Sequence, residues 1–246
     1  MKSLIIKLTA IGIIVVIIFG LYYCKPFNST VKVTNPHEIV GTSPATTPKL
    51  VPLDIKIPKP MFITGPRSID VPNLEKQSGK PRPPFMAPEG TKNVALGKTV
   101  FSTDNNPITG NIEMITDGDK EAAKGSYVEL GPFLQHITID LEARHNIYAI
   151  VIWHYHRQHR TYYDVVVQVA DDSDFITNVN TLFNNDIDNS AGLGIGKNMY
   201  YTETNEGKLI DAKGVKARYV RLYSNGNNSN DLNHYIEVEV YGKPVK

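Results

Sequence analysis

The distribution of proline is the feature that most constrains this chain. Of its 16 Pro residues, 13 lie between Lys25 and Thr91. Each Pro fixes its own φ, removes a backbone donor and disfavours helix in the residue before it, so this stretch is predicted to be extended or polyproline-like. The sequence therefore divides into an N-terminal segment over 1–25, a Pro-rich arm over 26–91 and a domain over 92–246.

The charge follows the same division. Up to Thr91 there are 11 Lys and Arg against 5 Asp and Glu, and after it there are 15 against 20. The near-neutral total therefore conceals a basic arm and an acidic domain, and an acidic domain argues against nucleic acid as a partner. The single Cys, Cys24, excludes a disulfide scaffold.

The first 25 residues are predicted to be an uncleaved membrane anchor. Lys2 and Lys7 precede the apolar run Leu8–Tyr23. Counted from Leu4, the run has about 20 residues, which spans a hydrocarbon core. Bulky Tyr stands where signal peptidase needs small residues, which favours an anchor; lipoprotein processing at Cys24 and cleaved secretion remain alternatives. Positive charge on the short leading side predicts an extracytoplasmic C-terminal domain, periplasmic or at the cell surface.

Two interpretations of the Pro-rich arm remain open. It is either a solvated stalk, which could reach on the order of 200 Å at ~3.1 Å per residue, or a docked strap. Leu50–Ile57 and Met61–Ile63 carry apolar residues that a plain spacer does not need. They indicate that part of the arm lies on an envelope protein partner or back on its own domain.

The domain from Lys92 onward shows the period-two alternation of half-buried β-strands. The alternating runs are Ile137–Leu141, Val165–Val169, Tyr219–Tyr223 and Ile236–Tyr241. Two more runs, apolar or aromatic enough for central strands, are Ile147–Trp153 and Met199–Thr204. We therefore predict an all-β fold, an antiparallel jelly-roll β-sandwich of about eight strands, after an N-terminal transmembrane helix and an extended Pro-rich arm.

Five short motifs of the domain fall in the order seen in discoidin domains. They are Asn93–Lys98, Ile115–Asp119, Ile137–Leu141, Ala217–Tyr223 and Ile236–Gly242. On these residues the domain resembles the discoidin, or coagulation-factor C-type, superfamily, which includes family 32 carbohydrate-binding modules with a galactose-binding-like fold. The resemblance covers about 150 residues and none of the arm or anchor. The chain departs from it at Ser126-Tyr127, where many relatives have Trp, and it lacks the terminal disulfide of many eukaryotic members.

The turn Asp117-Gly118-Asp119 is predicted to hold a structural Ca²⁺. Hard oxygen ligands gathered at a tight turn suit this ion. The resemblance implies a further ligand, a Glu on the last strand, and Glu237 matches that position best. The predicted metal ligands are therefore Asp117, Asp119 and Glu237, in a structural role. A turn that uses Asp-Gly for its backbone alone is the alternative.

The segment His154–Arg160 is the densest polar and aromatic cluster in the chain. If the preceding strand runs on, His154 and His156 point one way and Tyr155 and Arg157 the other. These residue types suit a sugar, because Arg and His give directional hydrogen bonds to hydroxyls and a Tyr face packs on the C–H side of the ring. A structural, hydrogen-bonded loop is the alternative. The predicted ligand contacts here are Tyr155, His156, Arg157, His159 and Arg160.

The Asn-rich loop Ser224–Asp231 is predicted to form a second wall of the ligand site, and Asn184–Ser190 a third. A hairpin loop that uses Asn for left-handed backbone is the alternative. The predicted ligand contacts in the second wall are Asn225, Asn227, Asn228 and Asn230.

The sequence shows no catalytic arrangement, and two non-enzymatic functions fit it. The first is a membrane-tethered extracytoplasmic binding module that recognises carbohydrate or a cell-surface ligand, or attaches to a surface, through loops at one end of the sandwich. The alternative is a non-catalytic accessory or scaffold subunit of a cell-envelope protein complex, with the sandwich and the Pro-rich arm as protein-interaction surfaces. Nucleic acid is not expected as a partner of either.

Overall fold

The computed structural model describes residues 48–61 and 70–245. They belong to one compact unit that spans Thr46–Lys246. The predicted anchor, Cys24 and the first part of the arm lie outside the described residues. Within the part of the chain that is described, no helix is both long enough and apolar enough to cross a membrane.

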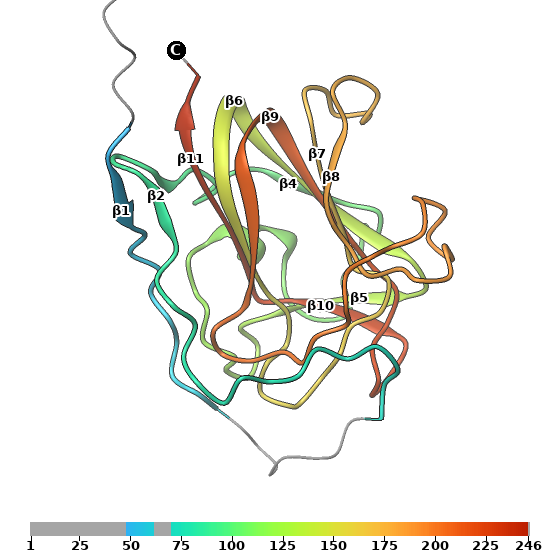
Figure 1. Ribbon diagram of the computed structural model, residues 1–246. Helices are drawn as coiled ribbons and strands as arrows, with labels where there is room; N and C mark the ends of the chain where they lie inside the picture. The colour runs from blue at the N-terminus through green and yellow to red at the C-terminus, as the bar shows by residue number, and fades with distance from the viewer. Residues whose placement is uncertain (1–47, 62–69, 246) are drawn as a thin grey trace, which may run out of the picture. The chain divides into compact units, whose positions relative to one another are not determined.

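The described residues form an all-β structure of antiparallel sheets, as predicted, and their one helix is a short 3₁₀ helix, η1 (Ile112–Thr116) (Figure 1). The main sheet has seven strands in the order β3-β11-β6-β9-β7-β8, with β4 also paired to β6. Its strands are β3 (Lys92–Asn93), β4 (Val100–Ser102), β6 (Gln135–Trp153), β7 (Val166–Ala170), β8 (Asn180–Asn184), β9 (Lys208–Ser224) and β11 (Glu237–Pro244). A second sheet pairs β5 (Val128–Pro132) with β10 (Leu232–Tyr235), and a third pairs β1 (Leu50–Pro52) with β2 (Met86–Pro88).

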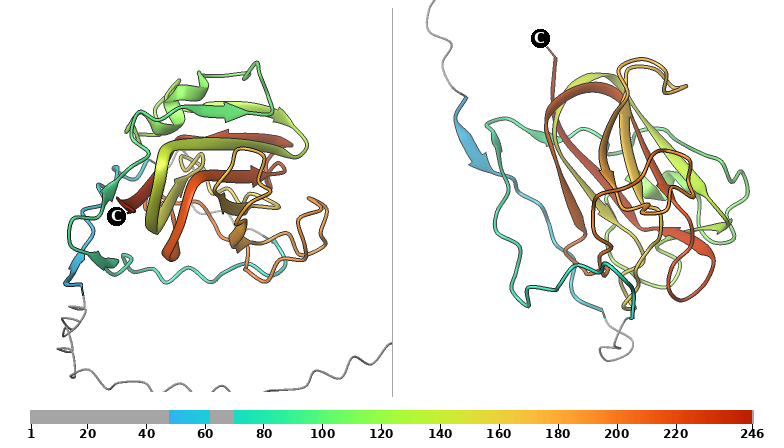
Figure 2. Two further views of the ribbon diagram at one scale, coloured as in Figure 1. Left: turned by 90° about the horizontal axis from the view of Figure 1, so that it is seen from above. Right: turned by 45° about the vertical axis from the view of Figure 1, so that its right-hand side comes forward.

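Two long strands, β6 and β9, run through the main sheet. The predicted strands Ile137–Leu141 and Ile147–Trp153 are both parts of β6, which has 19 residues. Register shifts after Asp140 and after Ile147 interrupt its pairing with β9. Such irregularities bend a strand pair, and Figure 2 shows β6 and β9 bent together. The first half of β6 pairs with β4 and the second half with β11.

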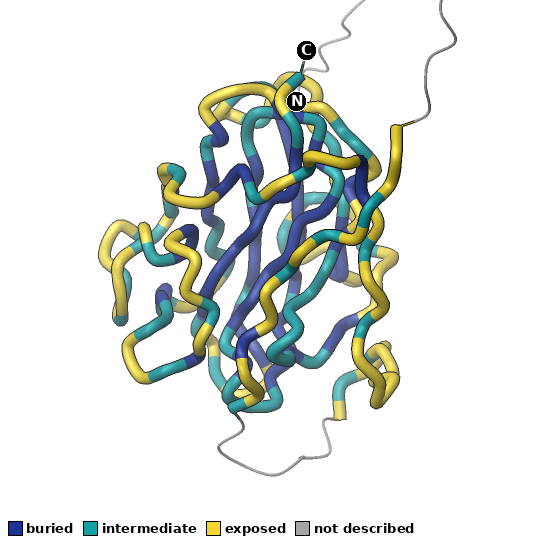
Figure 3. Tube along the Cα trace, turned by 90° about the vertical axis from the view of Figure 1, so that its left-hand side faces the viewer, coloured by how far each residue is buried: buried dark blue, intermediate teal, exposed yellow. Residues whose placement is uncertain are grey.

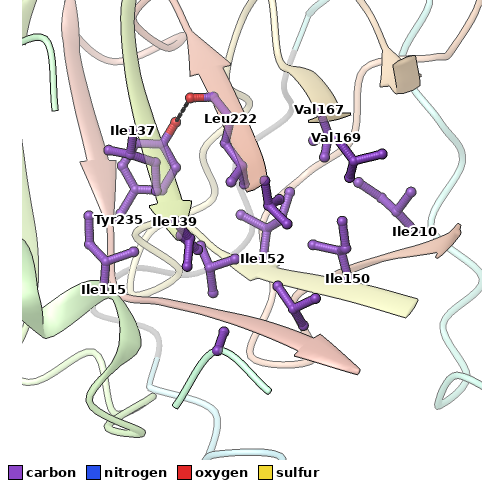
Figure 4. Packing of buried hydrophobic residues seen from close by; sticks show 14 of the residues in the cluster. Ile115, Ile137, Ile139, Ile150, Ile152, Val167, Val169, Ile210, Leu222 and Tyr235 are labelled. Carbon is purple, nitrogen blue, oxygen red and sulfur yellow. Dashed lines mark hydrogen bonds between the residues drawn. The ribbon is translucent and has the colours of Figure 1, made fainter. Parts of the chain in front are cut away.

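The inner face of the main sheet is apolar. Ile150 and Ile152 of β6 lie opposite Val240 and Val238 of β11, so these four side chains share one face. They belong to the main core cluster, which η1, β5 and β10 complete from the other layer. Other members of this cluster, shown in Figure 4, are Ile115, Ile137, Ile139, Val167, Val169, Ile210, Leu222 and Tyr235.

The outer face of the same half-sheet is buried as well. Val151 and Trp153 of β6 are fully buried, and they lie opposite Glu239 and Glu237 of β11. A strand buried on both faces needs apolar residues at every position, which is why Ile147–Trp153 does not alternate. Figure 3 shows these buried strands at the centre, with exposed residues over the loops. The prediction of a half-buried last strand is wrong, because Glu237 and Glu239 are also buried.

The described part of the Pro-rich arm covers this outer face. We call residues 48–61 and 70–91 the strap. Leu53, Ile55, Met61 and Phe85 pack on the cluster around Trp153. These residues of the arm are therefore docked on the domain and do not form a solvated stalk. The compact unit therefore begins before the predicted domain start at residue 92.

Hydrogen bonds hold the strap at several points. Within the strap itself, strand β1 pairs with strand β2. The guanidinium of Arg82 donates to the carbonyl oxygens of Gly207 (2.9 Å) and Glu206 (3.0 Å). The side chain of Asn205 donates to the carbonyl oxygen of Pro58 at 2.9 Å. The strap is thus fixed to the loop that precedes β9.

The prediction of a strand at Met199–Thr204 is wrong. This segment is a loop that meets the strap through one isolated bridge, between Tyr200 and Leu74. The amide of Glu75 donates to the carbonyl of Tyr200 at 2.8 Å, so the strap and not a sheet takes up its backbone hydrogen bonds. Its aromatic residues are buried against the sandwich: Tyr201 belongs to the main core cluster, and Tyr200 packs edge to face on Tyr163.

Candidate functional site

The structure brings the three predicted ligand loops together. The amide of Tyr163 donates to the carbonyl of Gly226 (3.1 Å), and the amide of Asn225 donates to the carbonyl of Tyr163 (2.9 Å). Oδ2 of Asp164 accepts hydrogen bonds from Nδ2 of Asn225 (2.9 Å) and from Oγ of Ser190 (2.8 Å). Asp164, a residue that the sequence did not single out and that follows the segment His154–Arg160, therefore joins the second and third loops.

The Asn side chains of the second wall hold the loop itself. Nδ2 of Asn227 donates to Oδ1 of Asn230 and to the carbonyl of Leu232, both at 2.8 Å. Oδ1 of Asn228 accepts from the amide of Thr161 at 2.9 Å. Asn227 is buried, whereas the side chain of Asn228 is exposed beside these bonds. Most of these amides are thus already engaged, as the structural-loop alternative expects.

The predicted alternation along His154–Arg157 is present in the burial of its side chains. His154 and His156 are buried, whereas Tyr155 and Arg157 are partly exposed. Nδ1 of His154 lies 2.6 Å from Oε1 of Glu203, and both side chains are fully buried. Burial lowers the pKa of His156, whose Nε2 lies 3.1 Å from a backbone carbonyl oxygen, that of Lys120. The structure therefore places His156 inside the protein and away from any surface ligand.

Two partly exposed tyrosines and a buried arginine form a cluster. The rings of Tyr127 and Tyr155 meet edge to face with centroids 4.9 Å apart, and both side chains are partly exposed. The guanidinium of Arg160 lies 4.7 Å from the centre of the Tyr155 ring. The sequence analysis predicted Arg157 and Arg160 alike as ligand contacts, and it is Arg160 that stacks on this ring. We call Tyr127, Tyr155 and Arg160 the tyrosine–arginine cluster.

His234 and Glu129 complete the polar side of this cluster. Nε2 of His234 lies 3.2 Å from Oε1 of Glu129, and Nη1 of Arg160 lies 3.2 Å from Nδ1 and 3.1 Å from Nε2 of the same ring. Burial and the charge of Arg160 lower the pKa of His234 to about 3, so the imidazole is neutral at neutral pH. A neutral ring can donate from Nε2 to Glu129 and accept at Nδ1 from Arg160. His234 therefore fixes the position of both charged groups.

Sequence reasoning did not find Glu129 and His234 as members of this site. They come from the paired strands β5 and β10, whose register places His234 opposite Glu129. No motif surrounds either residue, and their approach to the segment after β6 depends on the fold of the whole domain. The one available signal was the aromatic Tyr127 in a position where relatives often have Trp.

Glu237 lies against the predicted metal-binding turn. The amide of Gly118 donates to its Oε2 at 3.1 Å, whereas its Oε1 is buried without a hydrogen-bond partner. Burial, with smaller contributions from Glu239 and Asp117, raises the pKa of Glu237 to about 9. A buried oxygen acceptor with no partner fits a cation, because a cation would compensate the desolvated carboxylate.

The other two predicted ligands have backbone partners within the turn. Oδ1 of Asp117 accepts from the amide of Asp119 (2.8 Å), and Oδ1 of Asp119 accepts from the amide of Glu121 (2.9 Å). Both Asp side chains are exposed. Elsewhere in the described chain, ligand oxygens of three carboxylates lie within 4.8 Å of one another at Asp164, Asp186 and Asp188. Among the three predicted metal ligands, it is Glu237 whose buried, unpartnered oxygen fits a cation.

Comparison with known proteins gives structural likeness only. No protein-family model matches the sequence, and no curated protein matches it. Among solved structures, the chain is similar to a family 89 glycoside hydrolase from Clostridium perfringens (19% identity, TM-score 0.47), over 62% of this chain and 15% of that one. It is also similar to the family 32 carbohydrate-binding module of AlyQ (20% identity, TM-score 0.42), over 58% of this chain and 92% of the module.

A third similar structure is a fucose-binding module from Streptococcus pneumoniae, with 18% identity and a TM-score of 0.42, over 61% of this chain and 97% of that one. Family 32 modules are thus among the structures that this chain resembles. The chain spans 15% of the length of the family 89 hydrolase.

Proposed function

We propose that this chain is a membrane-tethered, extracytoplasmic carbohydrate-binding module without catalytic activity, built on a galactose-binding-like jelly roll. The observation that carries the proposal is the tyrosine–arginine cluster, where two partly exposed aromatic rings lie beside a guanidinium and the carboxylate of Glu129. Aromatic rings pack on the C–H face of a sugar. Charged donors and acceptors give strong, directional hydrogen bonds to its hydroxyls.

Each member of the cluster has a distinct part in this proposal. The rings of Tyr127 and Tyr155 supply the apolar surface. Burial raises the pKa of Tyr127, so its hydroxyl keeps its proton and can both donate and accept. Arg160, held by His234, donates hydrogen bonds, and Glu129, whose oxygens contact His234 and Thr109, positions His234.

Glycan-array binding of the full chain tests this function. We expect Tyr155→Ala to weaken binding about tenfold or more, because it removes most of the ring's packing surface. Tyr148→Ala, which removes a partly exposed Tyr from β6 away from the cluster, is the matched control and is expected to leave binding unchanged. The absence of any glycan binding, or an equal loss in both variants, would contradict the proposal.

The membrane tether rests on the apolar run Leu8–Tyr23 and the leading charges of Lys2 and Lys7. Cell fractionation should find the full chain with membranes, and protease added to intact cells or spheroplasts should digest its C-terminal domain. A chain found only in the soluble fraction, or one protected from the protease, would contradict the proposed location.

Ca²⁺ is proposed as a structural ion held by Glu237 together with Asp117 and Asp119. The support is the buried Oε1 of Glu237, which has no partner. A divalent cation would compensate this carboxylate and hold the turn against the last strand. Its role would be in stability and not in sugar chemistry.

The alternative function, an accessory subunit of an envelope complex, drew on the apolar residues of the Pro-rich arm. Leu53, Ile55 and Met61 pack on the chain's own sandwich, so they need no partner to cover them. This favours the carbohydrate-binding proposal. Stable co-purification with envelope proteins, together with no glycan binding, would reverse that preference.

A further inference from the structure

The cation in the tyrosine–arginine cluster has no anionic partner. Arg144 and Arg218 each form an ion pair with an Asp. Arg160 is only 8% exposed, yet no carboxylate among the described residues lies within 4.0 Å of its guanidinium. Its contacts include Oε1 of Gln158 at 3.1 Å and the rings of Tyr155 and His234.

The nearby acidic group does not cancel this charge directly. Oε1 of Glu129 is taken by His234, and its Oε2 accepts from Oγ1 of Thr109 at 2.8 Å. His234 is neutral at neutral pH and therefore solvates Arg160 only as a dipole. A buried charge without an opposite charge is costly, so the site carries an unmet preference for an anion.

A second guanidinium lies three residues along the chain. Arg157 is partly exposed, and its Nε is buried without a hydrogen-bond partner. It forms no ion pair with a carboxylate of the described residues either. Arg160, which lies over the partly exposed ring of Tyr155, and Arg157 therefore both lack a carboxylate partner among the described residues, in a domain with 15 Lys and Arg against 20 Asp and Glu.

We propose that this site selects acidic saccharides, and this inference rests on the carbohydrate-binding function proposed above. The carboxylate or sulfate of the sugar would accept hydrogen bonds from Arg157 and Arg160 while the sugar ring packs on Tyr155 and Tyr127. The planar fork of a guanidinium matches the two oxygens of such groups. A neutral sugar offers only hydroxyl dipoles and would leave the charge of Arg160 uncompensated.

Affinity electrophoresis of the full chain in gels with matched polymers tests the selectivity. Polygalacturonate is compared with its carboxyl-reduced form, and dextran sulfate with dextran, which separates the carboxylate from the sulfate as the source of charge. Polyglutamate controls for general attraction to polyanions. We expect retardation by at least one charged polysaccharide, weak or no retardation by its neutral counterpart, and none by polyglutamate.

Variants then assign the effect to the two arginines. Arg157→Ala is expected to weaken retardation by the charged polysaccharide about tenfold, the size of one lost charge-assisted hydrogen bond. Arg160→Lys keeps the charge and loses the fork, and a similar weakening is expected. Arg221→Ala is the matched control, because Arg221 also lies over an aromatic ring, 4.0 Å from the centre of Phe175, and forms no carboxylate ion pair with a described residue.

The outcomes separate this inference from the function on which it rests. Equal retardation by charged and neutral polymers, or strong retardation by polyglutamate, would overturn the selectivity for acidic saccharides and leave carbohydrate binding standing. Loss of all binding to these polymers and to a wider glycan array would overturn both. Thermal unfolding of each variant shows whether it is folded; if Arg160→Lys unfolds, Arg157→Ala alone decides.

Discussion

The two faces of the half-sheet formed by β6 and β11 are buried in different ways. On the inner face, Ile150 and Ile152 pack with the rest of the sandwich core. On the outer face, Trp153 is covered by an irregular, Pro-rich strap, and the carboxylates of Glu237 and Glu239 are buried next to it. One face is therefore a dry apolar core, and the other is a mixed layer of aromatic rings, acids and proline.

This difference shows that the outer face of a sheet can be buried by a largely irregular segment of chain. Proline has no N–H, so a Pro-rich segment leaves fewer backbone donors to satisfy where it lies against other residues. Its carbonyl groups are still available, and that of Pro58 accepts a hydrogen bond from Asn205. A strap of this kind thus covers an apolar surface with few ladder hydrogen bonds.

The largest effect is expected on the inner face. Ile150→Ala should lower the free energy of unfolding by about 3 kcal/mol, because it removes a fully buried side chain and leaves a cavity. Urea denaturation measures this change, and Ile176→Ala, at an exposed position, is the control. A loss no larger than that of a strap variant would show that the two faces contribute alike.

A pH-dependent effect is expected on the outer face. The folded state raises the pKa of Glu237 from 4.5 to about 9, so its stabilising protonated form is complete below about pH 4.5 and is lost as the pH rises through 9. In EDTA, wild type should lose stability relative to Glu237→Gln as the pH rises from 5 to 9.

The same denaturation series with Ca²⁺ tests the proposed ion. Added Ca²⁺ should stabilise the wild type at pH 8 and have little effect on Glu237→Gln, because that variant lacks the charge that holds the ion. Parallel pH profiles of the two proteins in EDTA would exclude Glu237 as the titrating group. Stabilisation by Ca²⁺ in both proteins would exclude it as a ligand.

A smaller effect is expected where the strap packs. Phe85→Ala should destabilise the unit by about 1.5 kcal/mol, less than the core variant, because Phe85 is only partly buried. Chemical denaturation gives the value, and Phe133→Ala, at a 79% exposed Phe, is the matched control. No change at Phe85 would mean that the strap contributes little to the stability of the sandwich.

The smallest global effect is expected at the strap's hydrogen bonds. Arg82→Ala should cost about 1 kcal/mol, since it removes two partly buried bonds to carbonyl oxygens. Its clearer result should be faster proteolysis within the strap, because a freed strap is open to a protease. Equal cleavage rates for wild type and variant would show that Arg82 does not hold the strap in place.

The alternation of apolar residues predicted most of the strands, and the apolar positions of the arm indicated that it could dock. The sequence could not show where it docks, because the strap meets β6 and the loop before β9 over long separations in the chain. The same limit explains why the burial of Glu237 and Glu239 could not be predicted. They alternate with Val238 and Val240 as solvent-facing residues do, but the turn at Gly118 lies against Glu237 and Lys120 pairs with Glu239 at 2.6 Å.

The candidate site was predicted in part. The loops after β6 and β9 were expected to meet, and they do. The residue types in His154–Arg160 do not show which of the histidines is buried. His156 was therefore predicted as a ligand contact, whereas the structure buries it. Glu129 and His234 depend on the pairing of β5 with β10, which no local pattern encodes.

The order of the strap and the sandwich along the chain has a mechanical consequence. The strap comes first, and its pairing of β1 with β2 precedes every bond of β6 and β9. Tension applied to the chain before residue 48 would therefore detach the strap while the longer strand ladders still hold. Residues 48–91, once peeled, could extend to on the order of 140 Å at ~3.3 Å per residue, so the chain ahead of the sandwich could lengthen while the loops after β6 and β9 stay folded.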